Sequence, residues 1–200
     1  MLWNAPNILT LLRIALIPIF IAAYYFPSPS AHILAMGLFI AAALTDWLDG
    51  YLARRLNQSS PFGAFLDPVA DKLMVACALV LLAADARVQA RVLDHRLFSV
   101  VVVIIIGREV TVSALREWMA ELGERARVAV SFLGKFKTTG QMFAIPFLLY
   151  REPLLGLPVM RIGEWLLYIA AGLTLWSMVI YLRAAWPSLM GKQGRDKPPS

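Results

Sequence analysis

Four aspartates lie close together in the chain, within or beside long apolar segments: Asp46, Asp49, Asp67 and Asp71. An ionised carboxylate is costly in apolar surroundings unless it is paired with a cation or bound to a metal ion. The first two are three residues apart and the last two are four apart, so each pair shares one face of a helix. Two helices that each present two carboxylates make an oxygen-rich site, which suits Mg²⁺ or Mn²⁺ better than zinc.

In a purely structural interpretation, the acids belong to a pair of transmembrane helices and nearby basic residues neutralise their charge. The candidate partners are Arg54 and Lys72, and two cations cannot balance four carboxylates. We therefore favour the metal site.

The residues around the aspartates form a longer pattern. Residues 46–71 read D-x2-D-G-x2-A-R-x8-G-x3-D-x3-D, which resembles the signature of the CDP-alcohol phosphatidyltransferase family at every fixed position. The resemblance implies a membrane enzyme that moves a phosphatidyl group from CDP-diacylglycerol to an alcohol and releases CMP. It also implies that Asp46, Asp49 and Asp67 hold Mg²⁺ or Mn²⁺, as two ions, and that Asp71 is a further metal ligand, the catalytic base, or both.

A second segment carries the same resemblance. Residues 4–13, N-A-P-N-I-L-T-L-L-R, look like the N-terminal signature of the family's bacterial glycerophosphate branch. The residues that the resemblance assigns to CDP binding are Asn7, Thr10, Gly50, Ala53, Arg54 and Gly63. Asn7, Thr10 and Arg13 form a polar stripe that would be costly against lipid, so it should face the protein interior, with Arg13 near phosphate or acid. Hydrogen bonding between helices is an alternative role for Asn7 and Thr10, as close helix packing is for the two glycines.

The acceptor alcohol is indicated by three further segments. G-R-E-V-T at 107–111, R-E at 116–117 and K-F-K-T-T at 135–139 also resemble the glycerophosphate branch, whose acceptor is sn-glycerol 3-phosphate. A phosphorylated acceptor needs fixed cations. The candidates are Arg108, Arg116, Lys135 and Lys137. We also expect a helix to begin directly after the two lysines, with Thr138 or Thr139 as its cap and with free amides that favour phosphate.

Other interpretations remain open at this stage. Arg108 and Glu109 could form ion pairs within one helix, and the two lysines could extend to the membrane surface to set the topology. Within the family, the acceptor could be inositol phosphate, serine or phosphatidylglycerol. From a different class, a cation transporter would also place acids at membrane depth.

The composition indicates an all-α, polytopic membrane protein. Hydrophobic residues make up 60% of the 200 residues and the mean hydropathy is +0.67, both high for a soluble domain. We expect about six transmembrane helices around a cytoplasm-facing polar cavity, in one domain over 1–186 with a flexible cytoplasmic tail over 187–200. A short surface helix is expected within 85–96. The expected apolar segments are 8–26, 31–53, 67–84, 97–115, 138–150 and 163–183, of which the fifth is short unless it starts earlier, near Val128.

Charge predicts the orientation and the partners. With the N-terminus inside, the predicted inner segments contain eleven Lys and Arg residues and the outer loops five, so both termini should be cytoplasmic and the protein should lie in the cytoplasmic membrane. The pI of about 9.8 then reflects orientation and anionic lipid or phosphate partners rather than nucleic acid. The family resemblance implies a homodimer. Cys77 is the single cysteine, so no internal disulfide can form.

Overall fold

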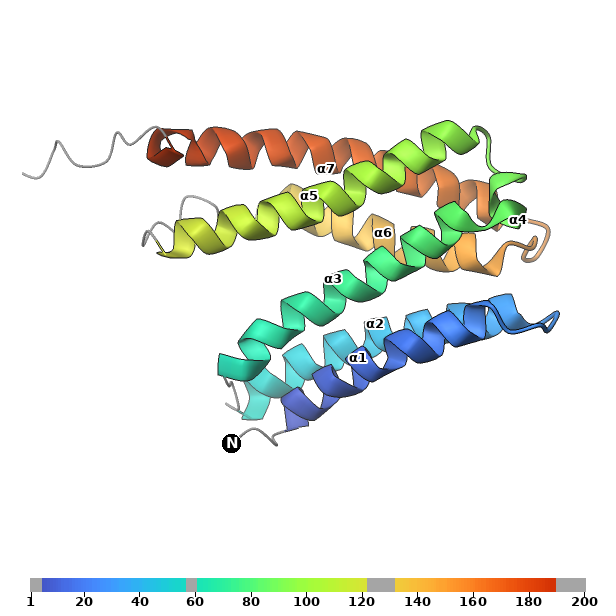
Figure 1. The fold of residues 1–200 in the computed structure, drawn as a ribbon, viewed down its shortest axis with the longest axis horizontal. Coiled ribbons are helices and arrows are strands. Elements are labelled where there is room, and N and C mark those ends of the chain that lie inside the picture. The colour runs from blue at the N-terminus through green and yellow to red at the C-terminus, as the bar shows by residue number, and fades with distance from the viewer. Residues whose placement is uncertain (1–4, 57–60, 122–131, 190–200) are drawn as a thin grey trace, which may run out of the picture.

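A computed structural model of the chain describes residues 5–56, 61–121 and 132–189. It does not describe the side chains of residues 5, 6, 47, 49–54, 56, 61–65, 67, 68, 132–138 and 187–189. The elements in the described ranges are α1 (Ala5–Tyr24), α2 (Ala31–Leu56), α3 (Pro61–Ala84), α4 (Ala86–Gln89), α5 (His95–Glu121), α6 (Phe132–Tyr150) and α7 (Val159–Leu189) (Figure 1). The all-α prediction is confirmed, and so is the short helix within 85–96. Of the predicted tail over 187–200, residues 187–189 belong to α7, and the rest lies outside the described residues.

Several of these helices have the length and composition of membrane spans. Among the described residues, three segments are long and apolar enough to cross a membrane: Asn7–Tyr24, His95–Glu121 and Val159–Trp186. Ala31–Asp46 is a shorter apolar segment of the same kind. Large apolar side chains such as Val103 and Trp176 are exposed on the outside of the bundle, as expected where lipid rather than water surrounds the protein.

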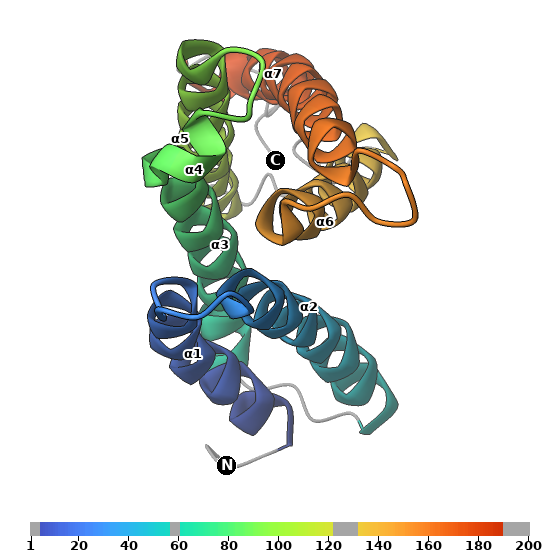
Figure 2. The ribbon, with the colours of Figure 1, turned by 90° about the vertical axis from the view of Figure 1, so that its right-hand side faces the viewer.

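The six long helices form a closed ring, seen end-on in Figure 2. Going round it, α1 packs on α2, α2 on α6, α6 on α7, α7 on α5, α5 on α3, and α3 again on α1. Along the chain, successive long helices run in opposite directions, so that α1 begins and α7 ends at the same end of the bundle (Figure 1). We call this the carboxylate end, because Asp46 lies toward it, and we call the opposite end the loop end.

The loop end is fixed by a polar cluster that joins three helices. Asp85, the N-cap of α4, accepts hydrogen bonds from the Arg87 backbone N–H (2.8 Å) and from the Tyr24 hydroxyl (2.9 Å). The Arg151 guanidinium pairs with Asp85 at 2.9 Å and lies 4.9 Å from the centre of the Tyr24 ring. Arg151 has a φ of 66°, in the left-handed region that favours glycine, so its side-chain contacts offset a backbone cost. The ends of α1, α3 and α6 are thereby tied together.

Gly163 allows helix α7 to pack closely against α6. A Cβ added at Gly163 would lie 2.8 Å from the Phe147 Cβ and 2.9 Å from the Ala144 carbonyl oxygen. Small residues allow helix backbones to approach in this way in membrane proteins. Gly163 therefore sets how α7 meets α6 near the loop end.

One expected helix boundary is wrong. Helix α6 begins at Phe132, so Thr138 and Thr139 lie inside the helix and neither caps its start. The polar run K-F-K-T-T lies within the first turns of the helix instead of before it, because lysine is a good helix former and threonine costs little. The free-amide argument for phosphate binding at that position is lost with the cap.

Candidate functional site

Arg13 and Asp46 form the centre of the site on α1 and α2. The Arg13 Nη1 donates to Asp46 Oδ1 at 2.6 Å, and the Arg13 side chain is only 1% exposed. The Asp46 side chain is 39% exposed, so the carboxylate remains accessible on one side of the pair. The expectation that Arg13 lies near an acid is confirmed. A buried guanidinium here lowers the cost of collecting carboxylates at this depth.

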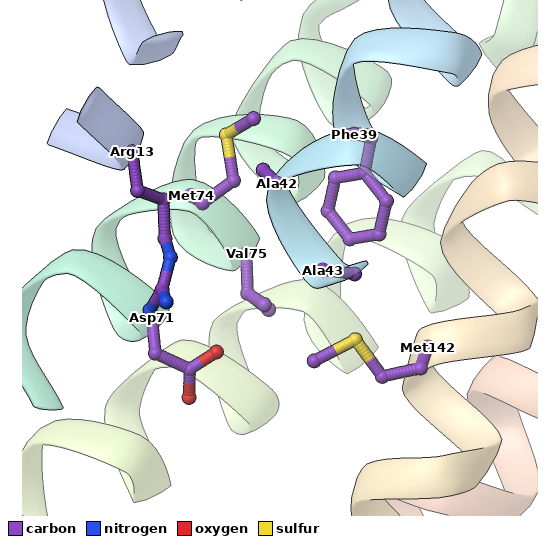
Figure 3. A pocket seen from close by; sticks show the side chains of 8 residues that line it. All are labelled: Arg13, Phe39, Ala42, Ala43, Asp71, Met74, Val75 and Met142. Atoms are coloured by element: carbon purple, nitrogen blue, oxygen red, sulfur yellow. The ribbon is translucent and has the colours of Figure 1, made fainter. Parts of the chain in front are cut away.

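Asp71 reaches the same region from α3. A small pocket is lined by Arg13, Asp71 and mostly apolar side chains of α2, α3 and α6. Figure 3 shows the Arg13 guanidinium and the Asp71 carboxylate beside each other at one side of this pocket, with Met142 across from them. The structure thus brings together two of the predicted aspartates, Asp46 and Asp71, around one buried cation.

A second pocket adjoins the first through shared residues. It is lined by Asp71, Lys72 and Val75 of α3, Glu109 of α5, and Gln141 and Met142 of α6. Glu109 also pairs with Arg108 at 3.3 Å. Asp71 therefore faces two neighbouring spaces, one toward Arg13 and one toward α5 and α6.

The other predicted metal and CDP residues belong to the same helix segments. Asp49, Gly50, Ala53 and Arg54 lie in the last turns of α2, and Gly63 and Asp67 lie in the first turns of α3, but their side chains are outside the described part. Asn7 and Thr10 are both buried on α1, at 2% and 0% exposed. The expectation that the α1 polar stripe faces the interior is confirmed.

The predicted acceptor cations are placed on α5 and α6. Arg108 is 7% exposed, donates to the Ser177 hydroxyl at 2.8 Å, and lies 5.7 Å from the centre of the Tyr181 ring. Its Nε is buried without a hydrogen-bond partner in the described part of the chain. Arg116 is exposed two turns further along α5. Lys135 and Lys137 lie in α6, and their side chains are outside the described part.

An apolar groove leads from Asp46 along the outside of α2 and α6. Its volume is about 590 Å³. It is lined mainly by Met36, Phe39, Ile40, Ala43, Leu44, Phe143, Pro146, Phe147 and Tyr150, with Asp46 at one end. The shape and lining suit an acyl chain whose polar end lies at the carboxylates.

The chemistry of the donors fits a hard divalent cation. Asp46 and Asp71 offer carboxylate oxygens from neighbouring helices, and these are the donors that Mg²⁺ and Mn²⁺ prefer. Among the described residues, neither a thiol nor an imidazole lines the two pockets next to Asp71. The described side chains therefore fit the group that the sequence pattern implies.

Sequence reasoning gave Gln141 no role, and it offered for Glu109 only an ion pair within its own helix, which the structure shows with Arg108. Both Gln141 and Glu109 line the pocket beside Asp71. In the sequence, Glu109 and Gln141 stand out only as polar residues within apolar helices. That pattern does not show which neighbouring helix each side chain faces.

The pattern of the CDP-alcohol phosphatidyltransferase family matches residues 3–176 of the chain. The chain is 53% identical over 187 residues to the CDP-diacylglycerol–glycerol-3-phosphate 3-phosphatidyltransferase of Pseudomonas fluorescens. The aligned residues cover 93% of this chain and 92% of that relative. It is 50% identical over 190 residues to the protein of that name from Pectobacterium atrosepticum, covering 95% and 99%. The Haemophilus influenzae protein of that name is 48% identical over 194 residues, covering 95% and 97%.

Proposed function

Because this chain belongs to the CDP-alcohol phosphatidyltransferase family, we propose that it transfers the phosphatidyl group of CDP-diacylglycerol to sn-glycerol 3-phosphate. The products are phosphatidylglycerophosphate and CMP, and the reaction belongs to phospholipid biosynthesis. The proposal rests above all on two relatives whose names state this activity. About half of the aligned residues are identical to theirs, and the alignments cover nearly the full length of the chain. The carboxylates around Arg13 supply the matching chemistry.

The metal ligands are the four aspartates. Asp46 and Asp71, with Asp49 and Asp67 from the same two helices, would hold Mg²⁺ or Mn²⁺, in our proposal as two ions. When bound, these ions neutralise the charge that develops on the diphosphate as CMP leaves. Arg13 contributes a fixed positive charge beside the same carboxylates.

In our proposal, Asp71 accepts the proton of the acceptor hydroxyl. It lines the pocket toward Arg13 and also the pocket toward Glu109 and Gln141. In the proposed reaction, the acceptor hydroxyl oxygen bonds to the phosphorus that carries the diacylglycerol, and the bond from that phosphorus to CMP breaks. A carboxylate oxygen of Asp71 accepts the hydroxyl proton.

CDP-diacylglycerol would bind with its polar and apolar parts separated. The nucleotide and diphosphate would contact α1, α2 and α3 near the carboxylate end, and an acyl chain would occupy the groove between α2 and α6. The absence of a side chain at Gly50 and Gly63 would leave room for the nucleotide. The proposed CDP contacts are Asn7, Thr10, Gly50, Ala53, Arg54 and Gly63.

The acceptor phosphate would be bound by the cations of α5 and α6. The buried Nε of Arg108, which has no partner in the described part, is a donor suited to an anion. Arg116 lies further along the same helix, and Lys135 and Lys137 lie in α6. These four residues are the proposed glycerol phosphate contacts.

In the proposed arrangement, all six long helices of the domain over 1–186 span the cytoplasmic membrane, with the carboxylate end and both termini on the cytoplasmic side and a tail over 187–200. Two facts support it: the helices alternate in direction, and the basic residues are concentrated in the inner segments. The carboxylates then face the compartment that holds the soluble acceptor. We further propose that the protein acts as a homodimer among membrane lipids.

One experiment separates the enzyme from a cation transporter. The purified protein is placed in vesicles that contain CDP-diacylglycerol, and radiolabelled glycerol 3-phosphate and Mn²⁺ are supplied outside. An enzyme incorporates the label into lipid without accumulating metal inside the vesicle. Metal accumulation without labelled lipid would contradict the proposed function.

A further inference from the structure

Gln141 carries a buried amide nitrogen that no described residue binds. It lies on α6, its side chain is 5% exposed, and its Nε2 has no hydrogen-bond partner in the described part of the chain. Leaving an amide N–H unpaired in the interior is costly, so nearly all such groups in native proteins find a partner. A donor left open next to a pocket is therefore a sign of a missing ligand.

The pocket that Gln141 lines is the one beyond Asp71. Its other polar walls are Asp71 and Lys72 of α3 and Glu109 of α5. Three helices that are far apart in the sequence thus place one amide, one ammonium and two carboxylates around a single small space.

The charges of this pocket decide which end of the acceptor it suits. Two carboxylates line this pocket against one ammonium, and Glu109 is not a proposed metal ligand, so its negative charge remains when a cation binds at Asp71 and disfavours a phosphate dianion beside it. Neutral hydroxyl groups are not repelled, and they can accept from an amide and donate to a carboxylate. The hydroxyl end of a phosphorylated polyol fits here, and its phosphate belongs with the arginines and lysines of α5 and α6.

We propose that the Gln141 amide donates a hydrogen bond to the central, non-reacting hydroxyl of the acceptor while its terminal hydroxyl faces Asp71. This inference rests on the proposed function. Gln141 is then a specificity residue that distinguishes a glycerol phosphate from an acceptor without the central hydroxyl. A site built to hydrogen-bond a hydroxyl rejects the analogue that lacks it, because the buried donor is left unpaired.

The test compares two acceptors in the full-length protein: sn-glycerol 3-phosphate and 3-hydroxypropyl phosphate, which lacks only the central hydroxyl. The wild-type protein should prefer glycerol 3-phosphate by about 5- to 140-fold in kcat/KM, the range expected for one hydrogen bond to a buried donor. Gln141→Leu keeps the size and removes the amide, so the preference should fall toward one. The KM for CDP-diacylglycerol should stay unchanged.

Thermal stability separates this role from a structural one. An unpaired buried amide destabilises the fold, so Gln141→Leu should have an unchanged or higher melting temperature. A structural hydrogen bond would give a lower one, with the acceptor preference intact, and that result would overturn the assignment. Gln141→Glu, which keeps the shape and removes the donor, should also lose the preference and serves if the leucine variant does not fold.

Failure of the inference is distinguishable from failure of the proposed function. If the wild-type protein uses glycerol 3-phosphate and Gln141→Leu keeps the full preference, only the role of Gln141 is refuted. If the wild-type protein uses neither acceptor with CDP-diacylglycerol, both are refuted.

Discussion

At the scale of single residues, the site depends on how charges are balanced at membrane depth. Arg13 is almost fully buried and bonds Asp46, and the pocket that it lines also contains Asp71. One guanidinium does not neutralise a group of carboxylates, so the site retains a negative charge that favours divalent cations. The same arrangement leaves Asp71 beside the second pocket, in which we propose that the acceptor hydroxyl binds.

Replacing Asp71 tests its proposed role directly. Asp71→Asn keeps the shape but removes the proton acceptor, so kcat should fall by about 10²- to 10⁴-fold. The matched control is Asp94→Asn at the loop end, where asparagine also caps the start of α5 and activity should not change. CMP release in detergent measures both variants, and an Asp71→Asn enzyme with normal turnover would place the base elsewhere.

Arg108 tests the acceptor-phosphate contacts. A charge-assisted hydrogen bond contributes about 1.5–3 kcal/mol, so Arg108→Gln should weaken the use of glycerol 3-phosphate by about 10- to 150-fold. The control is Arg91→Gln, which removes an exposed ion pair with Glu152 that contributes little. The KM values of both substrates are measured. Weaker binding of CDP-diacylglycerol instead would assign Arg108 to the diphosphate.

The sequence predicted part of this site and missed part of it. The spacing of the aspartates and the polar stripe on α1 were enough to place Arg13 near an acid, because helical periodicity decides which residues share a face. Gln141 was missed because a single glutamine in an apolar helix does not show whether the fold supplies its partner. That information depends on α3 and α5, which are distant in the sequence.

At the scale of elements, polarity proved a poor guide to where a helix begins. The apolar count placed the start of the fifth segment at Thr138, whereas α6 begins at Phe132. Lysine and threonine are compatible with helix geometry, so the change from polar to apolar marks a change of surroundings and not a change of backbone. The boundaries on the loop end agreed better, since Asp85 and the prolines are local signals that act through the backbone.

Gly163 tests the packing of α6 against α7. Gly163→Ala places a Cβ within 3 Å of Phe147 and of the Ala144 carbonyl, so the helices must separate at a cost of about 1–3 kcal/mol. Gly172→Ala in the same helix meets nothing within 4 Å and should leave the melting temperature unchanged or slightly higher. Melting in detergent compares the two. Equal stability of both variants would refute the close contact.

The loop-end cluster should make stability depend on pH through Asp85. Burial raises the pKa of this carboxyl, but the Arg87 N–H, the Tyr24 hydroxyl and the Arg151 charge together lower it below its usual range. A lowered folded-state pKa gives stability that is complete above the ordinary aspartate pKa of about 3.9 and is lost as pH falls through the folded value. Asp85→Asn should therefore melt below the wild-type protein at pH 7, and the difference should shrink at pH 3. A constant difference would show that the charge contributes nothing.

At the scale of the whole molecule, the ring of helices is what brings the site together. Helices α3, α5 and α6 surround the pocket beside Asp71, and α1 and α2 add Arg13 and Asp46. The sequence predicted the helices, but it could not predict their order round the ring, because contacts such as α2 on α6 join segments far apart in the chain. The ring also explains why both ends of the described chain lie at the carboxylate end.

The central claim concerns the reaction, and CMP release by the purified protein tests it most directly. The assay supplies CDP-diacylglycerol, Mg²⁺ or Mn²⁺, and one acceptor at a time from glycerol 3-phosphate, inositol phosphate, serine and phosphatidylglycerol. We expect metal-dependent CMP release with glycerol 3-phosphate and little with the others, with chelation abolishing the signal. No CMP release with any acceptor, or efficient release only with one of the other three, would contradict the account.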